Sequence, residues 1–300
     1  DYKLFNYYGA EDAEKVIIAM GSVCETIDET IDYLLKAGEK VGVIKVRLYR
    51  PFSAKHLLAV MPKTVKQISV LDRTKEPGSI GEPLYLDVVA ALKDTEFADV
   101  PVFTGRYGLG SKDTTPAQII AVYNNTEKKR FTIGINDDVT NLSLPTGPSP
   151  VTAPEGITSC KFWGLGADGT VGANKNSIKI IGDHTDMYAQ AYFDYDSKKS
   201  GGVTISHLRF GHSKIHSTYL INKADFVACH NPAYVRKYNM VQDLKDGGTF
   251  LLNCDWDMAG LEEHLPGQVK AYIANHGIEF YTIDGIKIGK EIGLGGRINT

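Results

Sequence analysis

Cysteine is scarce in this chain and is never paired at short spacing. The four cysteines, Cys24, Cys160, Cys229 and Cys254, lie far apart, and no two form a Cys-x-x-Cys motif. Iron–sulfur clusters and structural zinc sites draw several thiolates together, usually from such motifs. The sequence therefore argues against either kind of site within this piece. Scattered thiols are typical of small buried apolar residues in a reducing compartment, so we predict a packing role for them and a cytoplasmic location.

A strong excess of one charge and long apolar runs are also missing. The chain has 33 Lys and Arg against 36 Asp and Glu, a formal net charge of −3. This balance provides no electrostatic attraction to nucleic acid or to an anionic membrane surface. No run of about 18 apolar residues is present, the length that spans a bilayer, and no stretch has the pattern of a secretory signal. We therefore expect neither nucleic acid nor membrane as a partner.

Strand and helix patterns alternate through the first half of the chain. Short β-branched runs predict strands at residues 15–20, 41–48, 68–71 and 100–104. Helix-compatible runs follow them at residues 25–37, 54–61, 84–92 and 115–124. The alternation predicts an α/β domain with a mostly parallel sheet and helices on both faces. In such sheets the binding loops follow the carboxyl ends of the strands.

A proline-rich stretch separates the two halves. Four prolines lie within residues 145–154, which disfavours regular structure and predicts an extended linker at residues 137–158. We expect one domain at residues 1–136 and a second at residues 159–300, in line with a length of 300 residues. Further strands are predicted at residues 188–193, 202–209, 224–229, 249–252 and 278–283, with a helix at residues 266–275. This less regular order predicts a second α/β domain with a mixed sheet.

The strongest local motif is a glycine turn between a strand and a helix. An apolar, aromatic segment from Lys161 runs into Gly164, Gly166 and Gly169, and a helix-compatible run begins at Thr170. Backbone N–H groups converge at such a helix start, where the dipole also favours an anion. The motif therefore predicts a phosphate site, with a plain strand–helix connection as the alternative.

Two phosphate-binding motifs can be tested against this turn. A P-loop requires Gly-Lys-Ser/Thr at its end, whereas Gly172 is followed by Ala173 and the next lysine is Lys175, so the P-loop is excluded. The dinucleotide pattern Gly-x-Gly-x-x-Gly matches residues 164–169 literally. It also requires an acidic residue about 20 positions later on a second strand. Asp183 and Asp186 fall near that position without a clear strand before them, so the dinucleotide interpretation is weak.

Two polar loops are further candidates for a ligand site. Lys198 and Lys199 lie in a turn between two predicted strands, where they either reach a bound phosphate or form a solvated tip. A second glycine turn at residues 293–296 precedes Asn299, which either contacts an amide-rich ligand or caps a helix.

Charged residues also cluster at predicted strand ends in the first half. Arginines follow three of the strands, at Arg47 and Arg50, at Arg73 and at Arg106. They either form an anion site at the sheet edge or dock the domain on its neighbours.

A metal site has little support in the sequence. The histidines of the second half are His207, His212, His216 and His230. Their spacing lacks a partnering pattern of carboxylates or thiols, which disfavours a metal site. No Ser-His-Asp order and no Gly-x-Ser-x-Gly elbow is visible.

Long strings along the whole chain resemble one family, the pyruvate:ferredoxin (flavodoxin) oxidoreductases. They include Val46-Arg-Leu-Tyr-Arg-Pro-Phe52, Leu71-Asp-Arg-Thr-Lys-Glu-Pro-Gly78, Gly105-Arg-Tyr-Gly-Leu-Gly-Ser-Lys-Asp113, Gly164-Leu-Gly-Ala-Asp-Gly-Thr-Val-Gly-Ala-Asn-Lys175, Ser197-Lys-Lys-Ser-Gly-Gly-Val-Thr-Ile-Ser-His-Leu-Arg-Phe-Gly211, Ala228-Cys-His-Asn-Pro-Ala233 and Gly293-Leu-Gly-Gly-Arg-Ile-Asn299. The family enzyme is about four times longer, and only its second and third domains are similar to this chain. The first half resembles the carboxy-terminal domain of transketolase, and the second half resembles the gamma domain.

The resemblance implies a function and a set of site residues. In the family, pyruvate, coenzyme A and an oxidised carrier give acetyl-coenzyme A, carbon dioxide and a reduced carrier, with thiamine diphosphate and [4Fe-4S] clusters as cofactors. It implies that this chain contributes to coenzyme A binding through the residues Gly166, Ala167, Asp168, Gly169, Thr170, Val171, Lys198, Lys199 and Asn299. It also implies, as partners, the other domains of the parent enzyme, ferredoxin or flavodoxin, and a second copy in a homodimer.

The departures from the family pattern limit what the chain does by itself. No thiamine motif and no cluster cysteines are present, and the chain begins at Asp1 rather than Met, so we expect an internal piece that is inactive alone. A non-catalytic scaffold, a nicotinamide dinucleotide-binding domain, and a parent enzyme for another 2-oxoacid are the alternatives.

Overall fold

The computed structural model describes residues 2–137, 139–196 and 201–295. They form two compact units. The first contains the chain up to Ala153 together with a short later segment, His216–Tyr219. The second contains Pro154–Ile215 and the chain from Leu220 onward. Among the described residues, no helix has the length and apolar character needed to cross a membrane.

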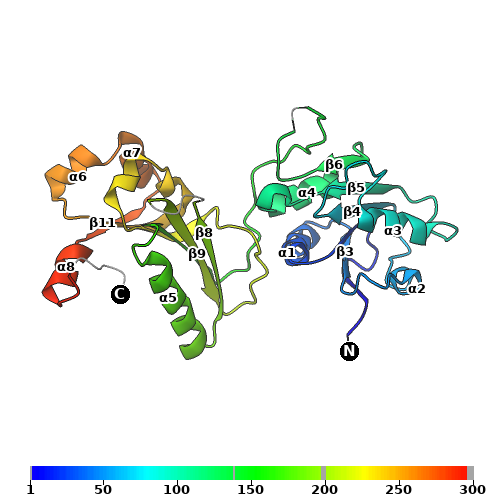
Figure 1. Ribbon diagram of the computed structural model, residues 1–300, viewed down its shortest axis with the longest axis horizontal. Helices are drawn as coiled ribbons and strands as arrows, with labels where there is room; N and C mark the ends of the chain where they lie inside the picture. Colours follow the sequence, from blue (N-terminus) through cyan, green and yellow to red (C-terminus); the bar gives the residue numbers. More distant parts are fainter. Residues whose placement is uncertain (1, 138, 197–200, 296–300) are drawn as a thin grey trace. The chain divides into compact units, whose positions relative to one another are not determined.

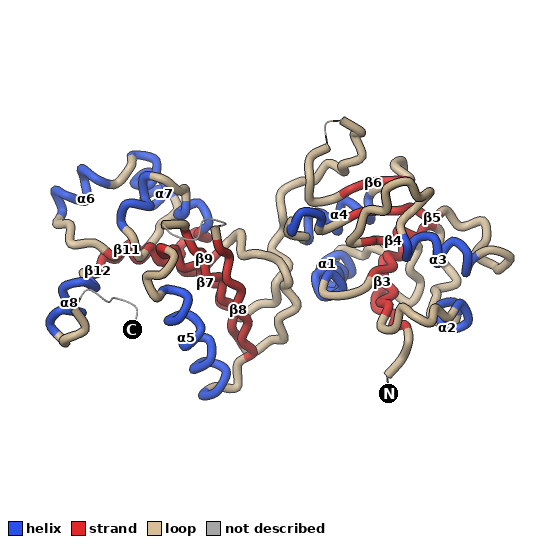
Figure 2. The backbone as a smooth tube through the Cα atoms, viewed as in Figure 1, coloured by secondary structure: helices blue, strands red, loops and turns tan. Residues whose placement is uncertain are grey.

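A six-stranded sheet forms the centre of the first unit (Figures 1 and 2), in the order β1-β3-β2-β4-β5-β6. Its strands are β1 (Phe5–Gly9), β2 (Lys15–Ala19), β3 (Val41–Val46), β4 (Gln67–Asp72), β5 (Val102–Arg106) and β6 (Arg130–Thr132). β1 is antiparallel to β3, and all other neighbouring strands are parallel. The mostly parallel sheet predicted from the sequence is thus confirmed, with β1 and β6 added at its two edges.

Apolar residues on both faces of this sheet are buried against helices. The helices are α1 (Val23–Lys36), α2 (Ala54–Leu58), α3 (Pro83–Leu92) and α4 (Pro116–Asn124). Side chains alternate between the faces of a strand. In β2, Ile17 and Ala19 join the core packed on α1 and α4, whereas Val16 and Ile18 join the core packed on α2 and α3. Helices therefore cover both faces, as the near-continuous apolar strands predict.

The second unit has a mixed six-stranded sheet in the order β12-β11-β10-β7-β9-β8. Its strands are β7 (Ile157–Leu165), β8 (Tyr188–Tyr195), β9 (Val203–Gly211), β10 (Ala224–Cys229), β11 (Leu244–Asn253) and β12 (Glu279–Ile283). β12, β11, β10 and β7 are parallel neighbours, whereas β9 is antiparallel to both β7 and β8. The predicted mixed sheet is confirmed.

Four helices of the second unit are α5 (Thr170–His184), α6 (Met258–His264), α7 (Gly267–Asn275) and α8 (Gly285–Glu291). Figure 1 shows α5 and α7 on opposite sides of the sheet. Trp163 joins the core that includes Val269 of α7, whereas the adjacent Gly164 lies against Thr170 of α5. The sequence patterns did not indicate α6 and α8, which are short helices that begin at aspartate caps, Asp257 and Asp284.

Candidate functional site

The glycine turn lies between the end of β7 and the start of α5. The Gly166 amide donates a hydrogen bond to the Gly202 carbonyl oxygen at 2.8 Å, which ties the turn to the start of β9. Gly169 precedes the first residue of the helix with φ of +90°, a conformation that favours glycine. Ala167 also has a positive φ, +75°, although it carries a Cβ atom. The strand–turn–helix predicted from the glycines is therefore present, with one residue under backbone strain.

Gly164 allows the helix to start close to the strand. A Cβ atom at this position would lie 2.1 Å from Oγ1 of Thr170 and 2.6 Å from its Cβ. Thr170 is fully buried, so its side chain has no space into which to move. Gly164 is consequently required by packing rather than by contact with a ligand.

Asp168 supplies a carboxylate inside the turn. Its Oδ2 accepts from the Leu165 amide at 2.8 Å, and its Oδ1 accepts from the Thr170 amide at 2.8 Å. The first four N–H groups of a helix have no acceptor within the helix, so this carboxylate satisfies one of them. The next amides of the first turn are those of Val171 and Gly172. The turn is therefore less open to an anion than the glycine pattern alone predicts.

A pocket of about 370 Å³ opens beside the turn. It is lined by Leu165, Gly166, Ala167, Asp168, Gly169, Val171, Gly172, Tyr195, Asp196, Gly202, Val203 and Thr204. The structure thus brings the predicted turn residues together with the ends of β8 and β9. Thr170 does not line the pocket and is fully buried.

Three predicted site residues, Lys198, Lys199 and Asn299, lie outside the described residues. The two lysines belong to the connection between β8 and β9, whose described ends line the pocket. Of the described lining residues, Asp168 and Asp196 carry charge, and none is basic. Tyr195, Asp196 and Thr204 lacked a motif of their own, because their place beside the turn depends on strand pairing.

His230 is a half-buried partner of the turn. Its Nδ1 lies 2.8 Å from Oγ1 of Thr170, and burial lowers the pKa of its imidazole. Its ring also packs edge-on against Phe162, with centroids 6.2 Å apart. His230 directly follows β10, at the carboxyl end of the strand, and it supports the turn through its contact with Thr170.

The strand order bears on the dinucleotide alternative. In a dinucleotide-binding unit, the strand after the helix returns parallel to the first strand. Here β8 follows α5 and runs in the same direction as β7, but it is not the neighbour of β7, because β9 lies between them and is antiparallel to both. Asp183 lies in the last turn of α5 and Asp186 in the connection after it, rather than at the end of a second parallel strand. The Gly-x-Gly-x-x-Gly match therefore lacks the structural context that would make it a dinucleotide site.

The arginines of the first unit are held by carboxylates and by local packing. Arg106 Nε lies 2.7 Å from Oε1 of Glu82, whose side chain is 1% exposed. Arg50 forms an ion pair with Asp87 at 2.8 Å and lies over the Tyr49 ring. These two guanidinium charges are compensated within the unit.

Other polar groups at the same sheet edge also have structural partners. Arg47 Nε donates to Oδ1 of Asn6 at 3.3 Å, and Arg73 packs along Gly108. Asp72 accepts hydrogen bonds from the Leu84 and Tyr85 amides, so it caps α3. Burial raises the pKa of Asp72.

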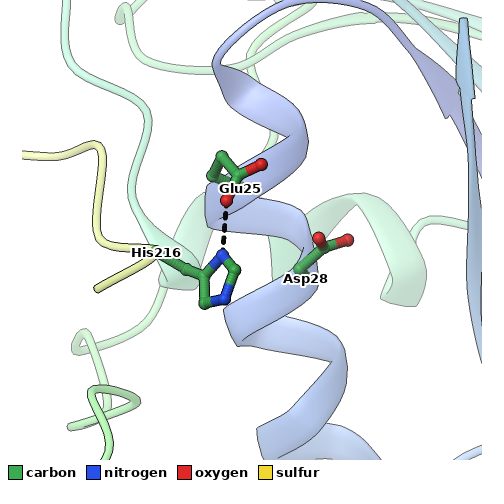
Figure 3. A group of neighbouring side chains, drawn as sticks. All are labelled: Glu25, Asp28 and His216. Carbon is green, nitrogen blue, oxygen red and sulfur yellow. Dashed lines mark hydrogen bonds and ion pairs between the residues drawn. The ribbon is translucent and has the colours of Figure 1, made fainter. Parts of the chain in front are cut away.

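One compact group of carboxylate and histidine side chains lies in the first unit, within the described ranges (Figure 3). Donor atoms of Glu25, Asp28 and His216 all lie within 4.8 Å of one another. Glu25 and His216 face each other and are hydrogen-bonded, whereas Asp28 extends away from them. Asp28 pairs with the ammonium of Lys45, and burial raises the pKa of its carboxyl group. We interpret the group as a polar network that holds His216 against α1.

The other histidines considered for a metal are separated in the fold. His207 is buried on β9, where its Nδ1 accepts from the Ile221 amide at 3.1 Å and burial lowers its pKa to about 3. His212 is paired with the exposed Asp186 at 3.4 Å. His230 contacts Thr170 as described above. These contacts assign each histidine a separate structural partner.

Comparison with known proteins identifies two family models along the chain. "Pyruvate:ferredoxin oxidoreductase core domain II" matches residues 13–119, and "Pyruvate ferredoxin/flavodoxin oxidoreductase" matches residues 159–300. The chain is 60% identical over 304 residues to a pyruvate-flavodoxin oxidoreductase of Enterobacter agglomerans. It is also 60% identical over 302 residues to a pyruvate:ferredoxin oxidoreductase of Moorella thermoacetica.

Essentially all of this chain is covered by these relatives. They match 100% and 99% of it, whereas it spans 26% of each of them. A mitochondrial pyruvate dehydrogenase [NADP(+)] of Euglena gracilis is 49% identical over 99% of this chain, which spans 17% of that relative. Both units are therefore related to consecutive parts of the same much longer proteins. The chain belongs to the pyruvate:ferredoxin/flavodoxin oxidoreductase family.

Proposed function

We propose that this chain is the part of a pyruvate:ferredoxin or pyruvate:flavodoxin oxidoreductase that binds coenzyme A. The parent enzyme converts pyruvate, coenzyme A and an oxidised carrier to acetyl-coenzyme A, carbon dioxide and the reduced carrier. The observation that carries the proposal is the pocket beside the glycine turn, in a chain with 60% identity to such enzymes along its whole length. Thiamine diphosphate and [4Fe-4S] clusters are assigned to parts of the parent outside this chain.

The chemistry of the pocket suits a ligand with both phosphate and amide groups. The Val171 and Gly172 amides at the start of α5 offer donors to a phosphate oxygen. Asp168 and Asp196 offer acceptors to amide or hydroxyl groups. A volume of about 370 Å³ accommodates one part of coenzyme A rather than all of it. Lys198 and Lys199 are proposed to supply the positive charge that the phosphates require.

The contribution of this chain to the reaction is orientation. Thiamine diphosphate supplies the decarboxylation chemistry when it is bound in the parent enzyme. The pocket residues would hold coenzyme A so that its thiol reaches the acetyl group. Fixing a reactant in this way removes part of the entropic barrier without acid–base chemistry in the pocket. The chain alone is therefore expected not to turn over pyruvate.

The carrier, the assembly and the location are proposals of the same kind. We infer ferredoxin or flavodoxin as the electron acceptor, the remaining domains of the parent as partners, and a homodimer in the cytoplasm. The bound oxoacid remains a prediction, with pyruvate favoured and another 2-oxoacid as the alternative.

A non-catalytic scaffold is the second candidate, and Asp168 favours it. Its carboxylate already accepts two backbone amides of the turn and places negative charge where a phosphate would approach. In this case the turn would be a plain connection, and the two units would only dock neighbouring domains.

Calorimetric titration of the 300-residue chain with coenzyme A separates these functions. We expect saturable binding that is lost in the Lys198→Ala/Lys199→Ala variant. The matched control is Lys63→Ala/Lys66→Ala, which removes the same charge from the exposed surface of the first unit. Heat from NAD but not from coenzyme A would overturn the proposal in favour of a dinucleotide site. No heat from either ligand would leave the scaffold.

A further inference from the structure

A hydrogen-bond chain runs from the glycine turn across the carboxyl ends of three parallel strands, β7, β10 and β11. Asp168 Oδ1 accepts from the Thr170 amide at 2.8 Å, and Oγ1 of Thr170 lies 2.8 Å from Nδ1 of His230. The His230 carbonyl oxygen accepts from Nδ2 of Asn253 at 2.9 Å. Oδ1 of Asn253 in turn accepts from the Gly285 amide at 2.9 Å. This hydrogen-bond chain therefore links the turn after β7 to the first residue of α8.

Two members of this hydrogen-bond chain, Thr170 and Asn253, are shielded from water, whereas Asp168, His230 and Gly285 are half-buried. Thr170 is fully buried and Asn253 is 8% exposed. The His230 amide donates to the Trp163 carbonyl oxygen at 2.9 Å, which continues the β7–β10 ladder by one residue. A hydrogen bond in a region of low dielectric constant is stronger than one in water, and loss of one partner leaves a buried polar group unsatisfied. A change at one member is thus expected to affect its neighbours along the chain.

Each end of the hydrogen-bond chain belongs to, or precedes in sequence, a segment with proposed ligand contacts. One end is the turn at residues 166–169, which lines the pocket. The other end is the start of α8, whose last residue, Glu291, precedes the glycine turn at residues 293–296 and Asn299. Asn253 is the only member that bonds to both His230 and Gly285, so it joins the two halves of the chain.

We propose that His230 and Asn253 are positioning residues that couple the glycine turn to the start of α8. As far as it concerns coenzyme A, this inference rests on the proposed function. The two residues do not line the pocket, so they act through Thr170 and Gly285. Coupling would keep the turn and the start of α8 at a fixed separation.

Amide hydrogen exchange tests the coupling without a ligand. The test uses the 300-residue protein. Asn253 is not a direct partner of the Thr170 amide, and His230 is not a direct partner of the Gly285 amide. We expect Asn253→Ala to speed exchange at Thr170 about tenfold, and His230→Ala to do the same at Gly285. His230→Asn, whose side-chain amide can take the place of Nδ1, should restore the wild-type rate at Gly285.

Two controls separate coupling from general loosening. Asn231→Ala removes a neighbouring side chain that caps a short 3-10 helix through the Ala233 amide and is not a member of the chain. It should leave both rates unchanged. Amides of β9 should also keep their wild-type rates in every variant. Faster exchange confined to the mutated residue's own bonded partners would overturn the coupling.

Titration of the same variants with coenzyme A tests the link to the ligand. The two alanine variants should bind coenzyme A about tenfold more weakly, and His230→Asn should bind close to wild type. If wild type binds no coenzyme A, the proposed function fails while hydrogen exchange still decides the coupling. If wild type binds coenzyme A and the alanine variants bind it equally well, the proposed effect of the hydrogen-bond chain on ligand binding is overturned.

Discussion

The carboxyl edges of the two sheets carry polar residues for different purposes. In the first unit, Arg106 is paired with the buried Glu82, Arg50 is paired with Asp87, and Asp72 caps α3. In the second unit, the edge carries a glycine turn with Asp168 inside it and a pocket of about 370 Å³ beside it. Both edges are where parallel sheets place their binding loops.

This comparison shows why charge at a strand end is a weak sign of a ligand site. The arginines of the first unit were open to interpretation as an anion site, but two of them have carboxylate partners within the same unit. The turn of the second unit has less basic character in its described residues, yet it adjoins a pocket. The structure shows carboxylate partners for arginines at the first edge and a pocket beside the polar groups at the second edge, and each of the following substitutions tests that difference.

The largest expected effect is on the first edge. Arg106→Met leaves the carboxylate of Glu82 buried and without its ion-pair partner, and should lower the free energy of unfolding by about 3 kcal/mol. Urea denaturation measures this change. Coenzyme A affinity should stay at the wild-type value, because the residue stabilises the fold and is not part of the pocket.

Two further variants check the cause of that loss. Replacing both partners, Arg106→Met with Glu82→Leu, should recover much of the stability, because no buried charge is left unpaired. Lys66→Met breaks an exposed pair with Glu14 and should cost less than about 1 kcal/mol. Equal losses for Arg106→Met and Lys66→Met would contradict a structural role specific to the buried pair.

A smaller loss of stability is expected at the second edge, together with a loss of binding. Gly164→Ala places a Cβ atom 2.1 Å from Oγ1 of Thr170. The displaced helix start should cost about 2 kcal/mol of unfolding free energy, measured by urea denaturation, and should weaken coenzyme A at least tenfold. Gly182→Ala is the matched control within α5, since its added Cβ would meet Ala189 at an ordinary 4.0 Å. Unchanged coenzyme A affinity in Gly164→Ala would show that the geometry of the turn does not govern the site.

The smallest effect concerns backbone strain in the turn. Ala167 has φ of +75°, and Ala167→Gly should raise the free energy of unfolding by up to about 1 kcal/mol because glycine adopts this conformation without a Cβ clash. The control is Ala173→Gly within α5, where the same change should cost about 1 kcal/mol. Thermal unfolding of both variants measures the difference in sign. A loss of stability in Ala167→Gly would mean that packing of its methyl group outweighs the strain.

Much of the fold could be predicted from the order of local patterns. The helices at residues 25–37, 84–92 and 115–124 agree with α1, α3 and α4 to within two residues at each end. The strand at residues 41–48 is shorter in the structure and ends at Val46. β1, β6, α6 and α8 were missed, because short segments have too few residues to show a period. β1 and β6 lie at sheet edges, where pairing with a single neighbour decides the strand.

The candidate site divides in the same way. The turn at Gly166–Gly169 and the helix start at Thr170 could be predicted, since glycines at fixed spacing constrain the backbone locally. Tyr195, Asp196 and Thr204 could not, because they join the pocket only through the pairing of β8 with β9. The link from Thr170 through His230 to Asn253 was likewise invisible, as it connects residues up to 83 positions apart whose proximity depends on β7, β10 and β11 lying side by side.

The sequence by itself determined the two α/β units, the position of the glycine turn and the family resemblance, because these follow from local periodicity, from glycine spacing and from long strings of residues. Only the tertiary structure decided which charges are compensated within the fold and which polar groups face a pocket. It also decided that Asp168 accepts a hydrogen bond from the first amide of the helix and that His230 supports the turn. These outcomes depend on distances between residues far apart in the chain, and hydrogen bonds and ion pairs form only when such distances close to about 3 Å.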